Sequence, residues 1–307
     1  MGSSEKIILH HYSASPYSEK ARLFLGFKKV SWSSVVMPSI LPKPDLIPLT
    51  GGYRRAPVLQ IGSDIYCDTS SILEKLHSIF PDPAISSDQN AESAELIGYL
   101  VDSEIFVKVA RFVMGSYAQK LPQDLVDDRA KMHPHYPFTR ENLEKDVEYL
   151  HLLLSKYLPK FGSILSSNRY FGGEVPAYAD FTIYTIFWFL NTIRKMKPLT
   201  GGRENLLAWF SRMKEFGQEE SSLITSEDAL LISKNSEPLP ISDPEVLDTG
   251  FKEGDKVLVS PEFYDHETIS GILLRSTSSE IILSSENDRV GKVHIHFPRL
   301  GYGLRKS

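Results

Sequence analysis

The sequence contains a single cysteine, Cys67, among its 307 residues. No disulfide can form within the chain, so the fold must depend on packing, and the reducing cytoplasm is the expected location. The sequence also has fewer basic than acidic residues, 34 against 39, which gives a net charge of −5. A general nucleic-acid binder needs a broad basic face, so we expect no nucleic-acid partner.

Long hydrophobic runs are missing as well. The most apolar stretch, residues 180–193, is too short to span a bilayer and begins with Asp180. No signal-peptide pattern opens the sequence. We therefore expect no membrane partner and interpret residues 180–193 as a buried core helix. With 41% hydrophobic and 24% charged residues, the composition is that of a globular protein, and 307 residues are enough for about two domains.

Three regions differ in their hydrophobic pattern. Residues 5–82 alternate short strand-like and helix-like segments, whereas residues 88–234 carry apolar side chains at helical spacing almost throughout. Residues 235–249 are rich in Pro, Ser and Asp and read as a linker, and residues 250–307 contain short β-rich runs separated by turns. The pattern predicts an α+β multidomain protein: an α/β domain, an all-helical domain and a small β-barrel-like domain that folds as a separate unit.

The stretch Ser-Pro-Tyr-Ser at residues 15–18 joins a predicted strand to a predicted helix. A thioredoxin-type redox enzyme has cysteine at both ends of such a turn, so this turn has no sulfur of its own. Ser15 is a natural helix N-cap. Its hydroxyl can also donate a hydrogen bond to a ligand group beside the positive end of the helix. The sequence leaves both roles open.

A second candidate site lies in the segment at residues 66–76, where a predicted strand ends and a helix begins. The free N–H groups of a helix N-terminus favour an anionic group of a ligand, and the carboxylate of Asp68 can take a ligand ammonium. The alternative is that Asp68 or Thr69 only caps the helix. Cys67 precedes Asp68, and we expect it to be buried and unreactive because a neighbouring carboxylate raises a thiol pKa.

Together these segments resemble the cytosolic glutathione S-transferase superfamily of the serine or cysteine type, with its thioredoxin-like N-terminal domain. The likeness covers roughly residues 6–230 and rests on SPYSEKAR, LTGGYRRAPVLQIG, CDTSSI and VPAYADFTIYTIFWFL. The chain departs from the family at Ala177, where a Ser or Thr cap is usual, although Asp180 can still accept backbone N–H groups there. Residues 235–307 have no counterpart in an ordinary two-domain member.

The resemblance implies a glutathione-binding domain over residues 5–82. The γ-glutamyl end of glutathione should lie at Asp68 and Thr69, and its cysteinyl backbone should pair with Ala56, before a cis Pro57. Lys43, or Arg54 or Arg55, could hold the glycine carboxylate. Ser15 is the expected activator of the thiol, and Tyr12 is its rival.

The implied function is a detoxifying transferase that activates the glutathione thiol for attack on a small hydrophobic electrophile, without a metal. The electrophile pocket is expected in the helical domain, 88–234, with Phe106, Val109, Phe112, Val113 and Tyr117 as candidate lining residues. Family members usually form homodimers, so we expect one here. A glutathione-dependent cis–trans isomerase and a non-catalytic binding or regulatory module are the alternatives.

Overall fold

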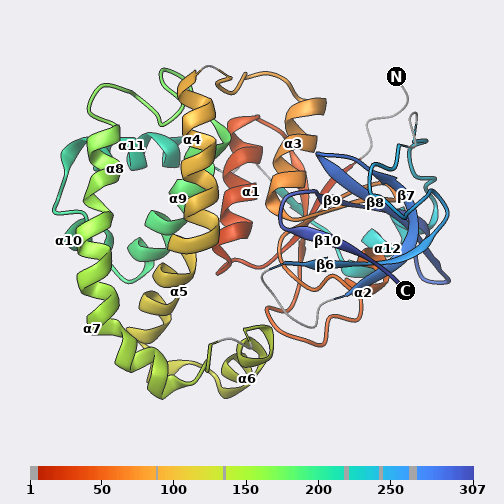
Figure 1. Cartoon of the computed structure of the whole chain (residues 1–307), viewed down its shortest axis with the longest axis horizontal. Coiled ribbons are helices and arrows are strands. Elements are labelled where there is room, and N and C mark those ends of the chain that lie inside the picture. The colour runs from red at the N-terminus through yellow and green to blue at the C-terminus, as the bar shows by residue number, and fades with distance from the viewer. Residues whose placement is uncertain (1–5, 88, 134–135, 218–220, 242–244, 263–267) are drawn as a thin grey trace.

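The computed structural model describes residues 6–87, 89–133, 136–217, 221–241, 245–262 and 268–307, and every statement below refers to these residues. Residue 5, the expected start of the first domain, lies outside them. The helical part and the sheet lie side by side, with the N-terminal domain between the long helices and the C-terminal strands (Figure 1).

The N-terminal domain has the thioredoxin-like arrangement that the sequence predicts. Strand β1 runs parallel to β2 and antiparallel to β3, which pairs antiparallel with β4. Its elements are β1 (Ile7–His11), α1 (Pro16–Phe27), β2 (Trp32–Val36), the one-turn α2 (Ile47–Thr50), β3 (Val58–Ile61), β4 (Asp64–Cys67) and α3 (Thr69–Ile79).

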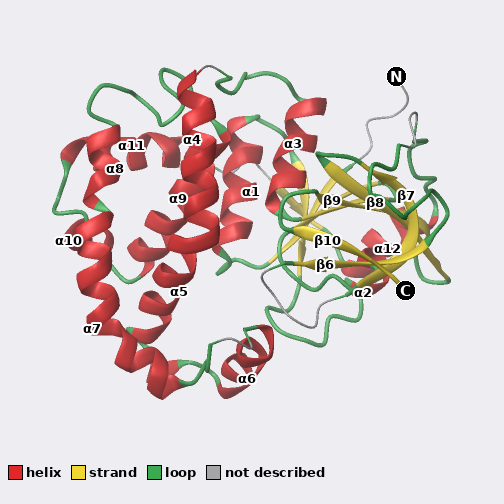
Figure 2. Ribbon diagram, in the orientation of Figure 1, coloured by secondary structure: helices red, strands yellow, loops and turns green. Residues whose placement is uncertain are grey.

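The second part is helical, as predicted (Figure 2). It comprises α4 (Gln89–Leu100), the π-helix η1 (Val101–Ile105), α5 (Phe106–Gly115), the 3-10 turn η2 (Ala118–Lys120), α6 (Gln123–Met132), α7 (Arg140–Tyr157), α8 (Pro159–Ile164), α9 (Tyr178–Thr192), α10 (Met196–Leu199) and α11 (Glu204–Glu215). Of the helices described, none has both the length and the apolar character needed to cross a membrane.

Helix α9 is the buried core helix expected from residues 180–193. Asp180 is fully buried, and its carboxylate accepts the N–H groups of Phe171, Gly172 and Ala177 at 2.9–3.1 Å. It also accepts the indole N–H of Trp209 at 2.8 Å. One carboxylate thus fixes the turn that precedes α9 and ties α9 to α11, although no side chain caps the helix at Ala177.

The C-terminal β-rich extension is present, but its strands continue the N-terminal sheet instead of closing on themselves. It contains β6 (Lys256–Pro261), β7 (Ile269–Ser276), β8 (Glu280–Asn287), β9 (Gly291–Pro298) and β10 (Tyr302–Lys306) in the antiparallel order β10-β6-β7-β8-β9. Strand β9 then pairs in parallel with β4, placing Tyr66 opposite His296. The described strands therefore form one ten-stranded sheet.

The two faces of the N-terminal sheet belong to different cores, because successive side chains of a strand point to opposite faces. Ile7 and Leu9 join the core of the helical part. On the other face, Ile65 packs in one core with extension residues such as Ile295 and Phe297. The expectation of a separate folding unit at residues 250–307 therefore needs correction, since the extension shares its core with the N-terminal domain.

The other expected domain limits stay predictions, but residues 221–234 associate with the sheet instead of the helical part. Residues 221–234 fall within the expected helical domain, yet β5 (Ser221–Leu223) pairs with β2 at the far end of the sheet. Helix α12 (Ser226–Lys234) covers the same sheet, and its Ala229 packs against Ile8 and Val35. The strand signal of three residues was too short to detect from the sequence pattern.

A buried polar cluster lies across the seam between β4 and β9. The His296 Nε2 is 3.0 Å from Asp64 Oδ1, and its Nδ1 is 3.8 Å from Glu280 Oε2. The Tyr66 ring stacks on this imidazole with the ring centres 4.3 Å apart. Burial lowers the pKa of His296, but the hydrogen bonds and charges of Asp64 and Glu280 outweigh it and raise the pKa above its ordinary value.

Candidate functional site

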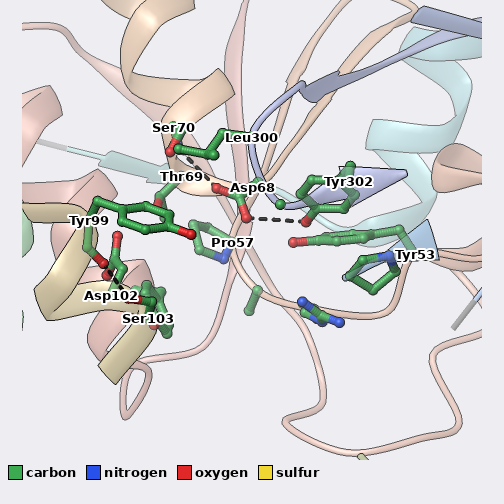
Figure 3. Close-up of a pocket in the computed structure, with 15 residues that line it drawn as sticks. Tyr53, Pro57, Asp68, Thr69, Ser70, Tyr99, Asp102, Ser103, Leu300 and Tyr302 are labelled. Atoms are coloured by element: carbon green, nitrogen blue, oxygen red, sulfur yellow. Dashed lines mark hydrogen bonds between the residues drawn. The ribbon is translucent and has the colours of Figure 1, made fainter. Parts of the chain in front are cut away.

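A cavity of about 180 Å³ opens where the N-terminal domain, the helical part and the extension meet (Figure 3). The N-terminal domain, α4 with its π-helix, and the extension all contribute to its lining. The lining residues are Tyr17, Tyr53, Arg55, Ala56, Pro57, Asp68, Thr69, Ser70, Tyr99, Asp102, Ser103, Pro261, Leu300, Gly301 and Tyr302.

Five residues expected from the sequence line this cavity. Arg55, Ala56 and Pro57 lie on one side of it, and Asp68 and Thr69 lie at the start of α3. The Ala56–Pro57 peptide bond is cis, as expected. The cavity therefore brings together the two predicted halves of the binding site, although the roles of these residues stay predictions.

Asp68 combines a capping contact with an unusual backbone. Its Oδ1 accepts the N–H of Ser70 at 3.0 Å, so it caps α3. Its φ of 76° lies in a region that non-glycine residues rarely adopt, and such strain is typical of functional sites. Capping and cavity lining therefore coexist at this residue, and the N-terminus of α3 faces the cavity through Thr69 and Ser70.

Asp102 is a cavity residue that the sequence analysis missed. It lies in η1, and π-helical turns occur frequently at functional sites. Its Oδ2 is 3.4 Å from Lys20 Nζ, whereas its buried Oδ1 has no hydrogen-bond partner among the described residues. Burial and the nearby Asp68 raise the pKa of Asp102 against the opposing effect of Lys20. Asp68 and Asp102 line the same cavity, and two carboxylates in one cavity can receive a ligand ammonium.

The extension supplies a further wall that sequence reasoning did not place here. Pro261, Leu300, Gly301 and Tyr302 line the cavity, and the Tyr302 phenol donates a hydrogen bond of 3.1 Å to Asp68 Oδ2. The two groups are 234 residues apart in the chain. No local motif signals such a contact, since it depends on the pairing of β9 with β4.

Ser15, the expected thiol activator, is 2% exposed and lies outside the residues that line the cavity. Its Oγ accepts the N–H of Ser18 at 3.1 Å, so it is the N-cap of α1. Its own N–H donates to the carbonyl of Tyr12 at 3.2 Å. Arg22 donates a hydrogen bond to the carbonyl of Ser13 at 3.2 Å and so stabilises the turn before α1. Because Oγ acts as an acceptor in the cap, its proton can still be donated to another acceptor.

Tyr12, the rival activator, also lies outside the cavity lining. Its phenol oxygen accepts from Arg129 Nη2 at 3.4 Å, and Lys43 Nζ lies 5.9 Å from the centre of its ring. Lys43 itself is 4% exposed and donates to the carbonyl of Arg54 at 2.7 Å. Arg54 forms an ion pair with Asp128 on α6. Of the basic residues expected to hold a carboxylate, only Arg55 lines the cavity among the residues described.

The expected electrophile pocket is only partly supported by the geometry. Val109, Phe112 and Val113 are at most 2% exposed and pack in the core of the helical part, so they are corrected to structural residues. Phe106 packs its ring 4.5 Å from that of the cavity residue Tyr17. Tyr117 is partly buried against the same core.

Two further groups can be assigned. Cys67 is fully buried, and burial together with Asp68 raises the pKa of its thiol well above the ordinary value, as expected for an unreactive cysteine. Within the part of the chain that the structure describes, no cluster of three or more His, Cys, Asp or Glu residues could hold a metal ion.

Comparisons with known families match both halves of this architecture. The model of the glutathione S-transferase N-terminal domain matches residues 9–84, and that of the glutathione S-transferase C-terminal domain matches residues 105–215. Together the two matches cover more than half of the chain. A search of curated proteins gave no significant match.

Solved structures extend the likeness to the whole chain. A glutathione S-transferase-like protein from Pseudomonas syringae is 35% identical, with a TM-score of 0.81 over 99% of this chain and 100% of that chain. A theta-class glutathione S-transferase from Xanthomonas axonopodis pv. citri, solved with glutathione bound, is 14% identical, with a TM-score of 0.52 over 68% of this chain and 93% of that one. A tau-class enzyme from mango is 17% identical, with a TM-score of 0.50 over 69% and 90% of the two chains. The latter two likenesses show the fold alone, whereas the first includes the extension.

Proposed function

The chain belongs to the glutathione S-transferase family, and from this premise we propose that it binds glutathione in the cavity beside Pro57 and activates the thiol of glutathione. The activated sulfur attacks a small hydrophobic electrophile. The reaction forms a carbon–sulfur bond and either expels a leaving group with its electron pair or adds to an activated double bond.

The observation that carries the proposal is the set of groups around the cavity. The N-terminus of α3 suits the α-carboxylate of the γ-glutamyl residue, because free N–H groups and the helix dipole favour an anion there. Asp68 and the unpartnered Oδ1 of Asp102 suit the adjacent ammonium. Ala56, before the cis Pro57, offers its backbone to the cysteinyl residue, and Arg55 suits the glycine carboxylate.

Ser15 is proposed as the activating group. It caps α1 next to Pro16, so a thiolate that approaches the turn can accept a hydrogen bond from the Ser15 hydroxyl and is stabilised by the positive end of a twelve-residue helix. Tyr12 remains the rival because its carbonyl accepts the N–H of Ser15, so the residue directly precedes the same turn. Phe106, which packs on Tyr17, is the proposed contact of the apolar electrophile.

Two further parts of the proposal concern assembly and location. We propose a homodimer in the cytoplasm, as the family resemblance implies. Leu96, Leu100 and Val107 on α4 and α5 are 75%, 50% and 37% exposed, and this apolar surface supports the proposal of a covering subunit. Light scattering at micromolar concentration should give twice the monomer mass, and a monomer mass would exclude the dimer.

The function is tested by two measurements on the intact protein. Retention on immobilised glutathione tests binding, and the absorbance change with glutathione and chlorodinitrobenzene tests transfer. Turnover with this or another electrophile of a broad panel supports the transferase. Retention without turnover favours the non-catalytic binding module, while conversion of a cis double bond to trans with no net consumption of glutathione favours the isomerase. Absence of glutathione binding would overturn the proposal.

A further inference from the structure

The extension reaches the cavity through the turn between β9 and β10. The N–H of Tyr302 donates to the carbonyl of Arg299 at 3.3 Å, and Gly301 adopts a φ of 87° that favours glycine. The carbonyl of Gly301 accepts the N–H of Glu262 at 2.9 Å, which fixes the turn to the end of β6. The turn thus holds Leu300 at the rim, 66% exposed, and Tyr302 inside, 3% exposed.

The Tyr302 phenol completes the hydrogen bonding of the Asp68 carboxylate. Ser70 N–H is bound to Oδ1 at 3.0 Å, and the Tyr302 hydroxyl is bound to Oδ2 at 3.1 Å (Figure 3). Burial raises the pKa of both the Tyr302 phenol and the Tyr53 phenol beside it well above the ordinary value, so Tyr302 keeps the proton that it donates to Asp68. The orientation of Asp68 is therefore fixed at both oxygens, by its own helix and by the extension.

An acceptor site for a cation lies beside this fixed carboxylate. Each carboxylate oxygen has two lone pairs, so Asp68 can accept further hydrogen bonds after those from Ser70 and Tyr302. Asp102 Oδ1, on the helical side of the same cavity, is buried without a partner among the described residues. An ammonium between the two would satisfy both groups at once.

We propose that Tyr302 is a positioning residue that sets the specificity of the site for thiol peptides with a free γ-glutamyl ammonium. It acts through Asp68, since its phenol holds that carboxylate in the orientation that the ammonium requires. This inference rests on the proposed function. It assigns to the extension a role in ligand selection, because Tyr302 lies in the extension. An ordinary two-domain member has no extension and therefore no equivalent of this tyrosine.

The test is a comparison of two ligands by titration calorimetry. Glutathione carries the γ-glutamyl residue, and cysteinylglycine lacks it. In Tyr302→Phe, the affinity for glutathione should fall about tenfold, as expected for the loss of one hydrogen bond to a charged group. The affinity for cysteinylglycine should stay unchanged. In steady-state assays KM for glutathione should rise while kcat at saturation is retained.

Controls separate this role from a structural one. Tyr149→Phe, on an exposed part of α7, removes the same atom far from the cavity and should leave the affinity ratio of the two ligands as in the wild type. Asp68→Asn should lower the affinity for glutathione relative to that for cysteinylglycine. Adding Tyr302→Phe to Asp68→Asn should lower this affinity ratio no further, because the two residues act as a unit.

The outcomes distinguish the inference from the function on which it rests. If the wild-type protein binds glutathione but Tyr302→Phe leaves the affinity ratio of the two ligands unchanged, the inference alone is overturned. The same holds if Tyr302→Phe weakens the binding of both ligands equally. Full additivity of Tyr302→Phe and Asp68→Asn also overturns it. A wild-type protein that binds no glutathione at millimolar concentration overturns the proposed function itself, and the inference with it.

Discussion

Replacing Ser15 by alanine should raise the thiol pKa of bound glutathione. An unperturbed thiol has a pKa of about 8.5. A hydrogen bond to a charged acceptor contributes about 1.5–3 kcal/mol, and the N-terminus of a helix such as α1 adds about 0.3–1 kcal/mol. At about 1.4 kcal/mol per pKa unit, the two together lower the thiol pKa by roughly 1.5–3 units. Loss of the hydroxyl alone should therefore raise the thiol pKa of bound glutathione by about 1–2 units.

The structure also determines which variants are informative. Ser15 Oγ caps α1 through Ser18 N–H, so Ser15→Ala also costs about 1 kcal/mol of stability. Glycine is a better N-cap than alanine, and Ser15→Gly therefore removes the hydroxyl at a cost of only a few tenths of a kcal/mol. Both variants should show the same rise in thiol pKa, whereas only Ser15→Ala should unfold appreciably earlier.

The assay is ultraviolet titration of the glutathione thiolate bound to the wild type, Ser15→Ala, Ser15→Gly and Tyr12→Phe. At pH 7 a shift of the pKa from about 6.5 to about 8 lowers the thiolate fraction from about three-quarters to about one-tenth. Turnover should fall in proportion, and glutathione affinity should change little because the contacts at Ala56, Asp68 and Thr69 remain. A wild-type titration curve for both Ser15 variants, with a shifted curve for Tyr12→Phe, would show that Tyr12 is the activator.

Three other predictions concern the fold. Removal of residues 236–307 should leave an insoluble fragment, because it uncovers the apolar side chains of Val58, Ile65 and Cys67; a soluble fragment that is retained on glutathione would contradict the shared core. Asp180→Asn should lower the free energy of unfolding by about 3 kcal/mol, since one buried carboxylate accepts four N–H groups, and an unchanged melting temperature would contradict this. His296 has a raised pKa in the folded state, so its contribution to stability is complete below the unfolded pKa of about 6.5 and is lost as the pH rises through the folded value. The stability difference between wild type and His296→Gln in urea unfolding should therefore be larger at pH 6 than at pH 9, and a difference independent of pH would refute the assignment.

The parts of the fold that the sequence predicted are those with local signals. Pro16 marks the first position of a helix, Pro57 directly precedes a strand, and Asp68 stands between a strand and a helix, so the N-terminal half of the site follows from residue types and spacing. Asp180 could be placed because a buried carboxylate at a helix start needs donors, and the backbone N–H groups of the preceding turn supply them.

The parts that escaped prediction depend on contacts between distant segments. Asp102 sits in a helical pattern whose acidic residues read as a solvated surface, and a π-helical turn has no sequence signature that separates it from an α-helix. The alternation of β9 predicts a strand but not its partner, so the pairing with β4 and the position of Tyr302 could not be predicted. Lys43 is a residue for which the sequence suggested a ligand contact that the structure does not provide. It is buried, and its ammonium donates a hydrogen bond to the carbonyl of Arg54.

The pairing of β9 with β4 also has a consequence during synthesis of the protein on the ribosome. The Asp64–His296 contact joins residues 232 positions apart, and at roughly 5–20 residues per second the second partner is made about ten to fifty seconds after the first. Throughout this interval the edge of β4 has open N–H and C=O groups, and Ile65 on the neighbouring face has no cover. The nascent N-terminal half thus presents both an unpaired strand edge and an apolar face. It is therefore prone to edge-to-edge aggregation until β9 has been made and pairs with β4.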